Sequence, residues 1–284
     1  MIQPTIAKKE VTKHILKTFG IHMSKKLGQN FLIDNGIVQR IVQAAAIEPG
    51  ELVLEVGPGI GTLTQGLAES GANIIAVEID KRLPEVLAKT LQGYDNVQIV
   101  SGDILKVNIP ELTNHSKFKV VANLPYYITT PIIMALLEQR LPVTKLVTMV
   151  QKEVALRMIA KPGKKDYGAL SVAVQYYTRP QIVADVPPQS FIPAPEVDSV
   201  VIVCDVLEEP AVAVKNEKMF FRVVKAAFAQ RRKTLANALK TMGIDGDQIK
   251  GALLAADIDG TRRGETLSLV EFAKIADQMT ELNS

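Results

Sequence analysis

The 284-residue sequence contains one cysteine, three histidines and no long apolar run. A single cysteine, Cys204, cannot form an internal disulfide, which is typical of proteins from a reducing compartment, so we expect a cytoplasmic protein. Three scattered histidines argue against a His-rich metal site, and we expect no metal. The longest apolar runs, such as residues 132–137, are much shorter than the roughly 18 residues of a membrane span. Residues 1–19 mix Lys and Glu among apolar residues, so we expect neither a secretory signal nor a membrane partner.

The formal net charge is only +3, but the positive charge is concentrated in three stretches. Residues 1–40 carry seven Lys and Arg against two acids, residues 152–165 carry five against one, and residues 222–240 carry six with no acid. Such stretches can be ordinary solvated helix surfaces. If folding gathers them on one side, they predict a surface that binds nucleic acid.

Apolar strands alternate with helical stretches through the first half of the sequence. The strand-like runs ELVLEV, ANIIAVEID and KVVANLPYY are each followed by a helical pattern, and NVQIVSGD is a further strand-like run between the last two. This alternation predicts an α/β fold with a mostly parallel sheet that is covered by helices on both faces. Three further runs, LSVAVQYYT, PQIVADV and VDSVVIVCDVL, have little helix between them, and we expect antiparallel strands there.

The pattern changes after residue 208, since residues 216–283 have helical spacing with glycines between the helices. We therefore predict three parts: a basic N-terminal extension (1–24), a catalytic α/β domain (25–208) and a smaller all-helical RNA-binding domain (209–284). Nothing in the sequence calls for a dimer, and we expect a monomer.

The first chemical motif is a glycine-rich turn between a strand and a helix. The stretch Glu55–Gly61 reads EVGPGIG, and its glycines, Gly57 and Gly59 among them, let the backbone approach a ligand closely. Glu78 ends the next strand, where a carboxylate can accept hydrogen bonds from both ribose hydroxyls of an adenosine cofactor. A nicotinamide dinucleotide also fits this spacing. Glu55 would repel a pyrophosphate, however, whereas it suits the ammonium and sulfonium of S-adenosylmethionine.

The next strand ends at Gly102, with Asp103 and Ile104 after it. The Asp103 carboxylate can accept a hydrogen bond from an adenine amino group, and Ile104 can pack against the ring. Asp103 could instead cap a helix. With Glu55 and Glu78 upstream, the cofactor is the preferred interpretation.

The fourth strand ends in the motif Asn123–Leu124–Pro125–Tyr126. Methyl transfer to an exocyclic adenine amine needs the nitrogen lone pair to be drawn out of the ring system and turned towards the sulfonium. The side-chain oxygen of Asn123 and the carbonyl of Leu124 can do this by accepting the amine hydrogens. Pro125 stiffens the turn, and Tyr126 offers a ring on which an extruded base can stack.

With three further motifs, the sequence resembles the ribosomal RNA adenine N6-dimethyltransferase family. Lys26–Leu32 (KLGQNFL) resembles its N-terminal motif, Phe191–Ser199 (FIPAPEVDS) its late loop, and Phe228–Leu235 (FAQRRKTL) the start of its helical domain. The resemblance covers about residues 24–280. It implies a Rossmann-like S-adenosylmethionine-dependent methyltransferase that dimethylates two adjacent adenosines in the 3′-terminal hairpin loop of 16S rRNA. The partner would be an immature 30S subunit, and the reaction a late step of its assembly.

The resemblance also assigns roles to single residues. Asn30 and Leu32 would close over the cofactor, Gly57 would approach its methionine part, and Phe191 would be a second stacking surface opposite Tyr126. The third basic stretch, residues 222–240, has no acids and is expected to contact RNA phosphates. Its candidate phosphate ligands are Arg222, Lys225, Arg231, Arg232 and Lys233.

Three alternatives remain open at this point. The first is a 23S rRNA adenine dimethyltransferase that confers antibiotic resistance, against which the late loop argues. The second is a ribosome-assembly or nucleic-acid-binding factor on a methyltransferase scaffold that has lost catalysis, against which the intact cofactor motifs argue. A DNA adenine methyltransferase shares the Asn123–Tyr126 chemistry but lacks the helical C-terminal pattern.

Overall fold

The computed structural model describes residues 4–24 and 27–282. Lys26, the first residue of the N-terminal motif, lies outside these residues. Contacts between residues divide the chain into two compact units. Unit 1 consists of residues 1–155 and 180–206, and unit 2 of residues 156–179 and 207–284. Compared with the division expected from the sequence, residues 1–24 thus group with unit 1 and residues 156–179 with the C-terminal helices. The assignment of functions to three domains stays a prediction.

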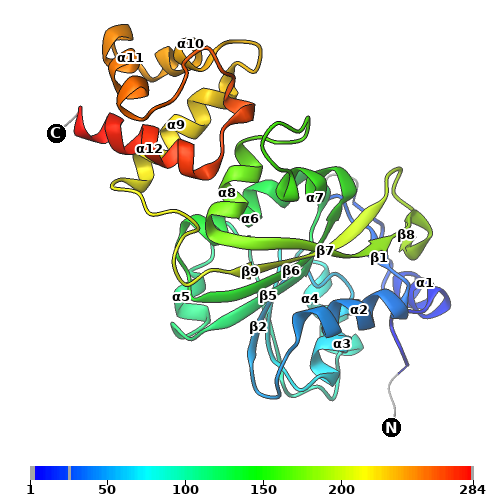
Figure 1. Ribbon diagram of the computed structural model, residues 1–284. Helices are drawn as coiled ribbons and strands as arrows, with labels where there is room; N and C mark the ends of the chain where they lie inside the picture. Colours follow the sequence, from blue (N-terminus) through cyan, green and yellow to red (C-terminus); the bar gives the residue numbers. More distant parts are fainter. Residues whose placement is uncertain (1–3, 25–26, 283–284) are drawn as a thin grey trace. The chain divides into compact units, whose positions relative to one another are not determined.

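A seven-stranded sheet forms the centre of unit 1 (Figure 1). In spatial order its strands are β4 (Val97–Ser101), β3 (Asn73–Glu78), β2 (Leu52–Val56), β5 (Phe118–Asn123), β6 (Val143–Gln151), β9 (Ser199–Val206) and β7 (Thr178–Val186). The strands from β4 to β6 are parallel, and β9 is antiparallel to β6. This confirms the mostly parallel sheet with an antiparallel strand late in the sequence.

The strand order reverses at one place in the sheet. The chain runs outwards from β2 to β3 and β4, then returns to lay β5 on the other side of β2. Ligands of open α/β sheets bind at the carboxyl ends of the strands beside such a reversal. Glu55 of β2 is in register with Val121 of β5, so the glycine turn after β2 and Asn123 at the end of β5 lie at the same edge of the sheet.

The helices of unit 1 precede or connect these strands. They are α1 (Lys9–Thr18), α2 (Asn35–Ala45), α3 (Thr62–Glu69), α4 (Leu83–Thr90), α5 (Ile109–Leu112), α6 (Thr129–Glu138) and α7 (Lys152–Ile159), whose last residues belong to unit 2. One apolar core gathers residues of α2, α3 and the central strands. A second joins α1 to α4, with Ile15, Leu16, Leu83 and Leu87 buried together, so α1 is packed onto the unit.

A small second sheet pairs two short strands that are far apart in the sequence. β1 (Phe31–Leu32) lies antiparallel to β8 (Phe191–Ile192), with Leu32 opposite Phe191. The backbone N–H of Ile33 also donates to the carbonyl of Ser190 at 2.8 Å. The N-terminal motif and the late loop, which carried much of the family resemblance, therefore lie side by side.

Unit 2 contains α8 (Ala169–Tyr177), α9 (Glu217–Ala229), α10 (Leu235–Leu239), α11 (Gly246–Ala255) and α12 (Leu269–Glu281). The helical character expected for residues 216–283 is confirmed for those described. The strand expected at LSVAVQYYT is wrong, because residues 169–177 form α8. Nearly every α8 side chain is buried, and a run that is apolar on all sides has no periodicity to separate a helix from a strand. Tyr176 stacks on Phe220 of α9, with ring centroids 4.7 Å apart.

Candidate active site

A pocket lies at the carboxyl ends of β2, β3 and β5. Its lining consists of residues 27–32, the glycine turn with Thr62 and Leu63 at the start of α3, Glu78 with Ile79, and residues 123–127. A second hollow shares Gly57, Ile79, Pro125 and Tyr127 with the first and extends to residues 102–104 after β4. The folding of the sheet thus brings together all four motifs that the sequence singled out.

The glycine turn leaves open space where a side chain would otherwise stand. Gly57, Gly59 and Gly61 have φ angles of +69°, +62° and +94°, a region that residues with a Cβ rarely adopt. A Cβ added at Gly57 would meet nothing within 4 Å, whereas one at Gly59 would lie 3.3 Å from the Phe31 ring. The space at Gly57 is therefore available to a ligand.

Glu55 is a buried carboxylate at the base of the pocket. It is 1% exposed, and its Oε2 atom has no hydrogen-bond partner among the residues that the structure describes. Burial raises the pKa of Glu55 to about 8, and the nearby Glu78 carboxylate contributes in the same direction. A buried acid with a free oxygen is a strong acceptor for a cationic ligand. This acceptor fits the ammonium or sulfonium of S-adenosylmethionine.

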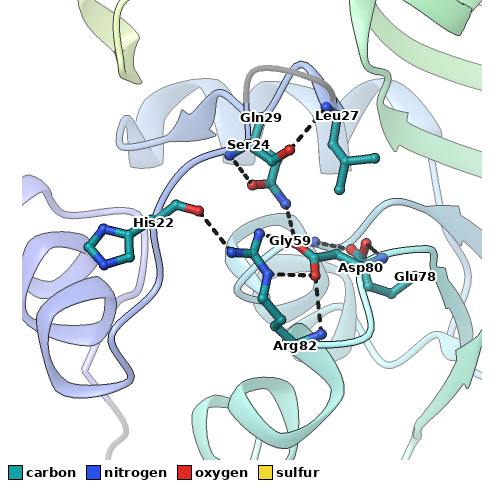
Figure 2. Close-up of polar contacts among 8 residues, drawn as sticks. All are labelled: His22, Ser24, Leu27, Gln29, Gly59, Glu78, Asp80 and Arg82. Atoms are coloured by element: carbon teal, nitrogen blue, oxygen red, sulfur yellow. Dashed lines mark hydrogen bonds and ion pairs between the residues drawn. The ribbon is translucent and has the colours of Figure 1, made fainter.

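Glu78 ends β3 and faces the pocket with both oxygens held by backbone groups. Its Oε2 accepts from the N–H of Gly59 at 3.0 Å, and its Oε1 accepts from the N–H of Asp80 at 2.8 Å (Figure 2). The side chain is 4% exposed, and burial raises its pKa. Each oxygen keeps a further lone pair, so an oriented carboxylate remains able to accept from ribose hydroxyls.

Asp103 and Ile104 line the second hollow. The Oδ1 atom of Asp103 accepts from the N–H of Leu105 at 3.0 Å, and its Oδ2 lies 3.8 Å from Nζ of Lys106. No described helix begins at Asp103, so the helix cap that was its alternative interpretation is wrong; residues 104–106 form a turn, and Ile104 is buried. Asp103 also borders the hollow, so its role towards adenine stays a prediction.

Asn123 is the last residue of β5 and closes the other side of the pocket. Its Nδ2 group donates to the backbone carbonyl of Asn30 at 3.2 Å. Since the NH₂ half of the amide is engaged there, its Oδ1 atom is the half left to accept hydrogen bonds from a ligand. The Leu124 side chain is buried, and its N–H donates to the Met149 carbonyl at 3.2 Å, which fixes the motif to β6.

The two expected stacking residues lie in different environments. Tyr126 is half-buried at the pocket, and its hydroxyl shares a 2.6 Å hydrogen bond with that of Ser199. Phe191 is 3% exposed and belongs to the apolar core around α2 rather than to the pocket lining. Stacking on Phe191 stays a prediction, and it would require the ring to be uncovered.

Three pocket features were missed from the sequence. Tyr127 is 56% exposed and lines both hollows, beside the Tyr126 that the motif suggested. Ile79 is 45% exposed, and an exposed apolar residue directly after a strand-end acid was a detectable pattern. Gln29 also lines the pocket and bonds to Asp80, a contact across 51 positions that no local pattern predicts.

The candidate RNA residues lie in unit 2 and differ in their contacts. Arg222 and Lys225 are exposed one turn apart on α9, and Arg232 and Lys233 are exposed after its end. Arg231 instead donates to the carbonyls of Lys165 and Tyr167 at 2.7 and 3.3 Å and pairs with Glu265. Residues 160–165 and 231–233, which belong to two of the three basic stretches, are therefore neighbours.

Among residues 4–24 and 27–282, no group of three or more His, Cys, Asp or Glu side chains could hold a metal ion. In the same part of the chain, no helix is both long enough and apolar enough to span a membrane.

The sequence matches the family model described as ribosomal RNA adenine dimethylase over residues 20–276. It is 48% identical to ribosomal RNA small subunit methyltransferase A of Alkaliphilus oremlandii, covering 97% of this chain and 98% of the relative. It is 51% identical to the protein of the same name from Clostridioides difficile, covering 94% of each.

Two solved structures are also similar. A dimethyladenosine transferase from Plasmodium falciparum superposes with a TM-score of 0.75 at 28% identity, covering 89% of this chain and 97% of that one. The 23S rRNA methyltransferase ErmE superposes with a TM-score of 0.67 at 26% identity, covering 88% and 100%. The identity to the small-subunit enzymes is thus about twice that to the large-subunit enzyme.

Proposed function

Because the chain belongs to the ribosomal RNA adenine dimethylase family, we propose that it methylates the N6 atoms of two adjacent adenosines in the 3′-terminal hairpin loop of 16S rRNA. It is an rRNA adenine methyltransferase, and S-adenosylmethionine is its methyl donor. Relatives of about 50% identity over nearly the full length are named for the small subunit, which supports this target over 23S rRNA.

The pocket residues suit the parts of S-adenosylmethionine. Gly57 leaves room for its methionine portion, and the free Oε2 atom of Glu55 suits the cationic groups. Glu78 would hold the ribose hydroxyls, while Asp103 and Ile104 would hold the adenine. The bound cofactor supplies an electrophilic methyl group.

Asn123 carries the chemical step in this proposal. The Oδ1 atom of its amide and the Leu124 carbonyl would each accept one hydrogen of the target amine, which draws the nitrogen lone pair out of conjugation with the ring and directs it towards the methyl group. The methylated nitrogen would be cationic and would release its proton to solvent water, so no strong base is needed. Tyr126 would stack on the extruded base.

The substrate would be an immature 30S subunit, bound through the exposed basic residues of unit 2. We propose a monomeric, cytoplasmic enzyme that needs no metal. The position of Pro125 at the start of the 3₁₀ turn Tyr126–Ile128 would hold the aromatic side chain beside the amide.

The single observation that carries the proposal is the orientation of the Asn123 amide by the Asn30 carbonyl at the same pocket as Glu55 and Glu78. We expect Asn123→Ala to lower kcat on immature small subunits about 100-fold or more while calorimetry still detects S-adenosylmethionine binding. Mass spectrometry should place the methyl groups of the wild-type reaction on 16S rRNA. Full activity of the variant would refute the mechanism, and methylation of naked 23S rRNA instead would refute the target. Absence of cofactor binding in the wild type would favour a non-catalytic assembly factor.

A further inference from the structure

Asp80, two positions after Glu78, is held by a dense set of hydrogen bonds (Figure 2). Its Oδ1 accepts from Nε of Arg82 at 2.9 Å, and its Oδ2 accepts from Nη2 of Arg82 at 2.6 Å. Only 5% of the Asp80 side chain is exposed, and the guanidinium lowers its pKa to about 2. A two-point bond from arginine to a nearly buried carboxylate fixes direction as well as charge.

The same carboxylate binds the N-terminal segment that forms one wall of the pocket. Nε2 of Gln29 donates to Oδ2 of Asp80 at 2.8 Å, and Oε1 of Gln29 accepts from the N–H of Ser24 at 2.9 Å. Arg82 adds a second link, because its Nη1 donates to the carbonyl of His22 at 3.1 Å. The side chains of Gln29, Asp80 and Arg82 thus hold residues 22–24 and 27–29 against the turn after β3.

The segment held by these bonds leads directly to Asn30, which contacts Asn123. Gln29 is followed by Asn30, whose backbone carbonyl accepts the hydrogen bond of the Asn123 amide. On the other side, the N–H of Asp80 donates to Oε1 of Glu78. A short chain of hydrogen bonds and peptide bonds therefore links the candidate ribose carboxylate to the candidate catalytic amide.

We propose that Gln29, Asp80 and Arg82 are positioning residues for methyl transfer, because they set the place of the Asn30 carbonyl and thereby the orientation of the Asn123 amide. This inference rests on the proposed function of the pocket. None of the three side chains needs to touch the reacting atoms. Loosening them would let the Asn123 amide rotate and offer its NH₂ group, which cannot accept an amine hydrogen.

An exchange of the two polar groups tests the proposal. In Asp80→Asn, one acceptor oxygen becomes a donor that faces the donors of Gln29 or Arg82. In Gln29→Glu, a carboxylate faces the carboxylate of Asp80. The double variant Gln29→Glu/Asp80→Asn restores a donor opposite an acceptor between positions 29 and 80 and keeps the Ser24 bond, but its new amide nitrogen cannot accept from Nη2 of Arg82. We expect each single variant to lower kcat about tenfold or more, and the double variant to lose clearly less than the product of the two single losses.

A second readout uses the protein without cofactor or RNA. Hydrogen exchange followed by mass spectrometry should show about tenfold faster exchange of residues 27–32 in each single variant, and slower exchange again in the double variant. The control is Glu51→Gln. Glu51 forms a 2.6 Å ion pair with Lys119 and does not line the pocket. The variant should change neither kcat nor the exchange of residues 27–32.

The proposal is overturned if the loss of kcat in the double variant equals the product of the two single losses. It is also overturned if the single variants accelerate the hydrogen exchange of residues 27–32 and lower Tm while kcat and KM stay unchanged. That result would mean that the three residues only stabilise the fold. A wild-type chain that transfers no methyl group to small subunits would instead refute the proposed function, and the exchange measurements would still report whether residues 27–32 are held by Asp80.

Discussion

The hydroxyl groups of Tyr126 and Ser199 share a 2.6 Å hydrogen bond across 73 positions of the chain. Ser199 begins β9, is fully buried and lies opposite Gln151 of β6. The fourth residue of the catalytic motif is thus anchored to the last residue of the late loop motif. Burial raises the pKa of the Tyr126 hydroxyl, so it stays protonated and the bond persists at neutral pH.

This bond predicts that Ser199→Ala and Tyr126→Phe have the same effect. Each removes one partner and keeps the ring, so each should lower kcat about five- to tenfold by letting the ring move. The double variant should be no worse than either single one, because both remove one interaction. Single-turnover methyl transfer to immature small subunits measures this.

The control is Thr148→Val on β6, whose buried hydroxyl has no partner among the described residues. It should leave kcat unchanged. Additive losses in the double variant would show that Tyr126 and Ser199 act independently.

The raised pKa of Glu55 predicts a pH-dependent stability. The unfolded side chain ionises near its ordinary value of 4.5, and the folded one near 8. Between these values the folded state holds the extra proton, so its stability falls as the pH rises. Relative to Glu55→Gln, the ligand-free wild type should lose about 2 kcal/mol of unfolding free energy between pH 6 and 8. Urea denaturation at both pH values measures this.

S-adenosylmethionine should bind the wild type more tightly as the pH rises over the same range, because the anionic Glu55 favours a cation. Glu55→Gln should bind it more weakly and without that pH dependence. Glu51→Gln is the control. Because Lys119 lowers the pKa of Glu51, its stability contribution changes only below pH 4.5. If the affinity for S-adenosylmethionine changes with pH equally in the wild type and in Glu55→Gln, Glu55 is not the group that binds the cation.

The open space at Gly57 predicts a separation of stability from binding. Gly57→Ala should lower the unfolding free energy by about 1 kcal/mol, because its φ of +69° strains an L-residue. It should also weaken S-adenosylmethionine binding tenfold or more, since the methyl group enters the ligand space. Thermal denaturation and calorimetry give the two quantities.

Gly50→Ala is matched to it, because Gly50 has a φ of +85°, open space at the Cβ position and no place in the pocket lining. It should lose similar stability and keep full affinity. If Gly57→Ala binds as well as Gly50→Ala, the cofactor does not approach this turn.

The basic residues of unit 2 are expected to separate by their contacts. Arg232→Ala and Lys233→Ala should each reduce the slope of log Kd against log salt by about 1, because each removes a phosphate contact. Arg231→Ala should mainly lower the stability of unit 2, since Arg231 donates to two carbonyls there. Binding of 16S rRNA at several salt concentrations, with denaturation in parallel, measures both.

Lys250→Ala serves as the control, because Lys250 is paired with Asp247 at 3.1 Å and lies outside the basic stretches. Its salt slope should match the wild type. Equal slopes for all four variants would show that RNA binds elsewhere.

Much of the pocket could be predicted because its motifs are local. Glu78 and Asn123 end strands, Glu55 lies one residue before the end of another, and parallel strands present their carboxyl ends at one edge. The strand expected at residues 169–177 was wrong because burial on all sides hides periodicity. Gln29 was missed because its place depends on a contact across 51 positions that no local pattern records, whereas Ile79 and Tyr127 directly follow residues that the sequence did single out.

The sequence by itself determined the alternation of strands and helices, the glycine turn and the chemical types at the strand ends, since these follow from periodicity and backbone freedom. Only the tertiary structure decided which groups face one another. The Asn123 amide donates to the Asn30 carbonyl, Asp80 accepts from Gln29, and Phe191 packs in the core. These contacts join segments that are far apart in the sequence, so they depend on how the sheet and its loops fold together.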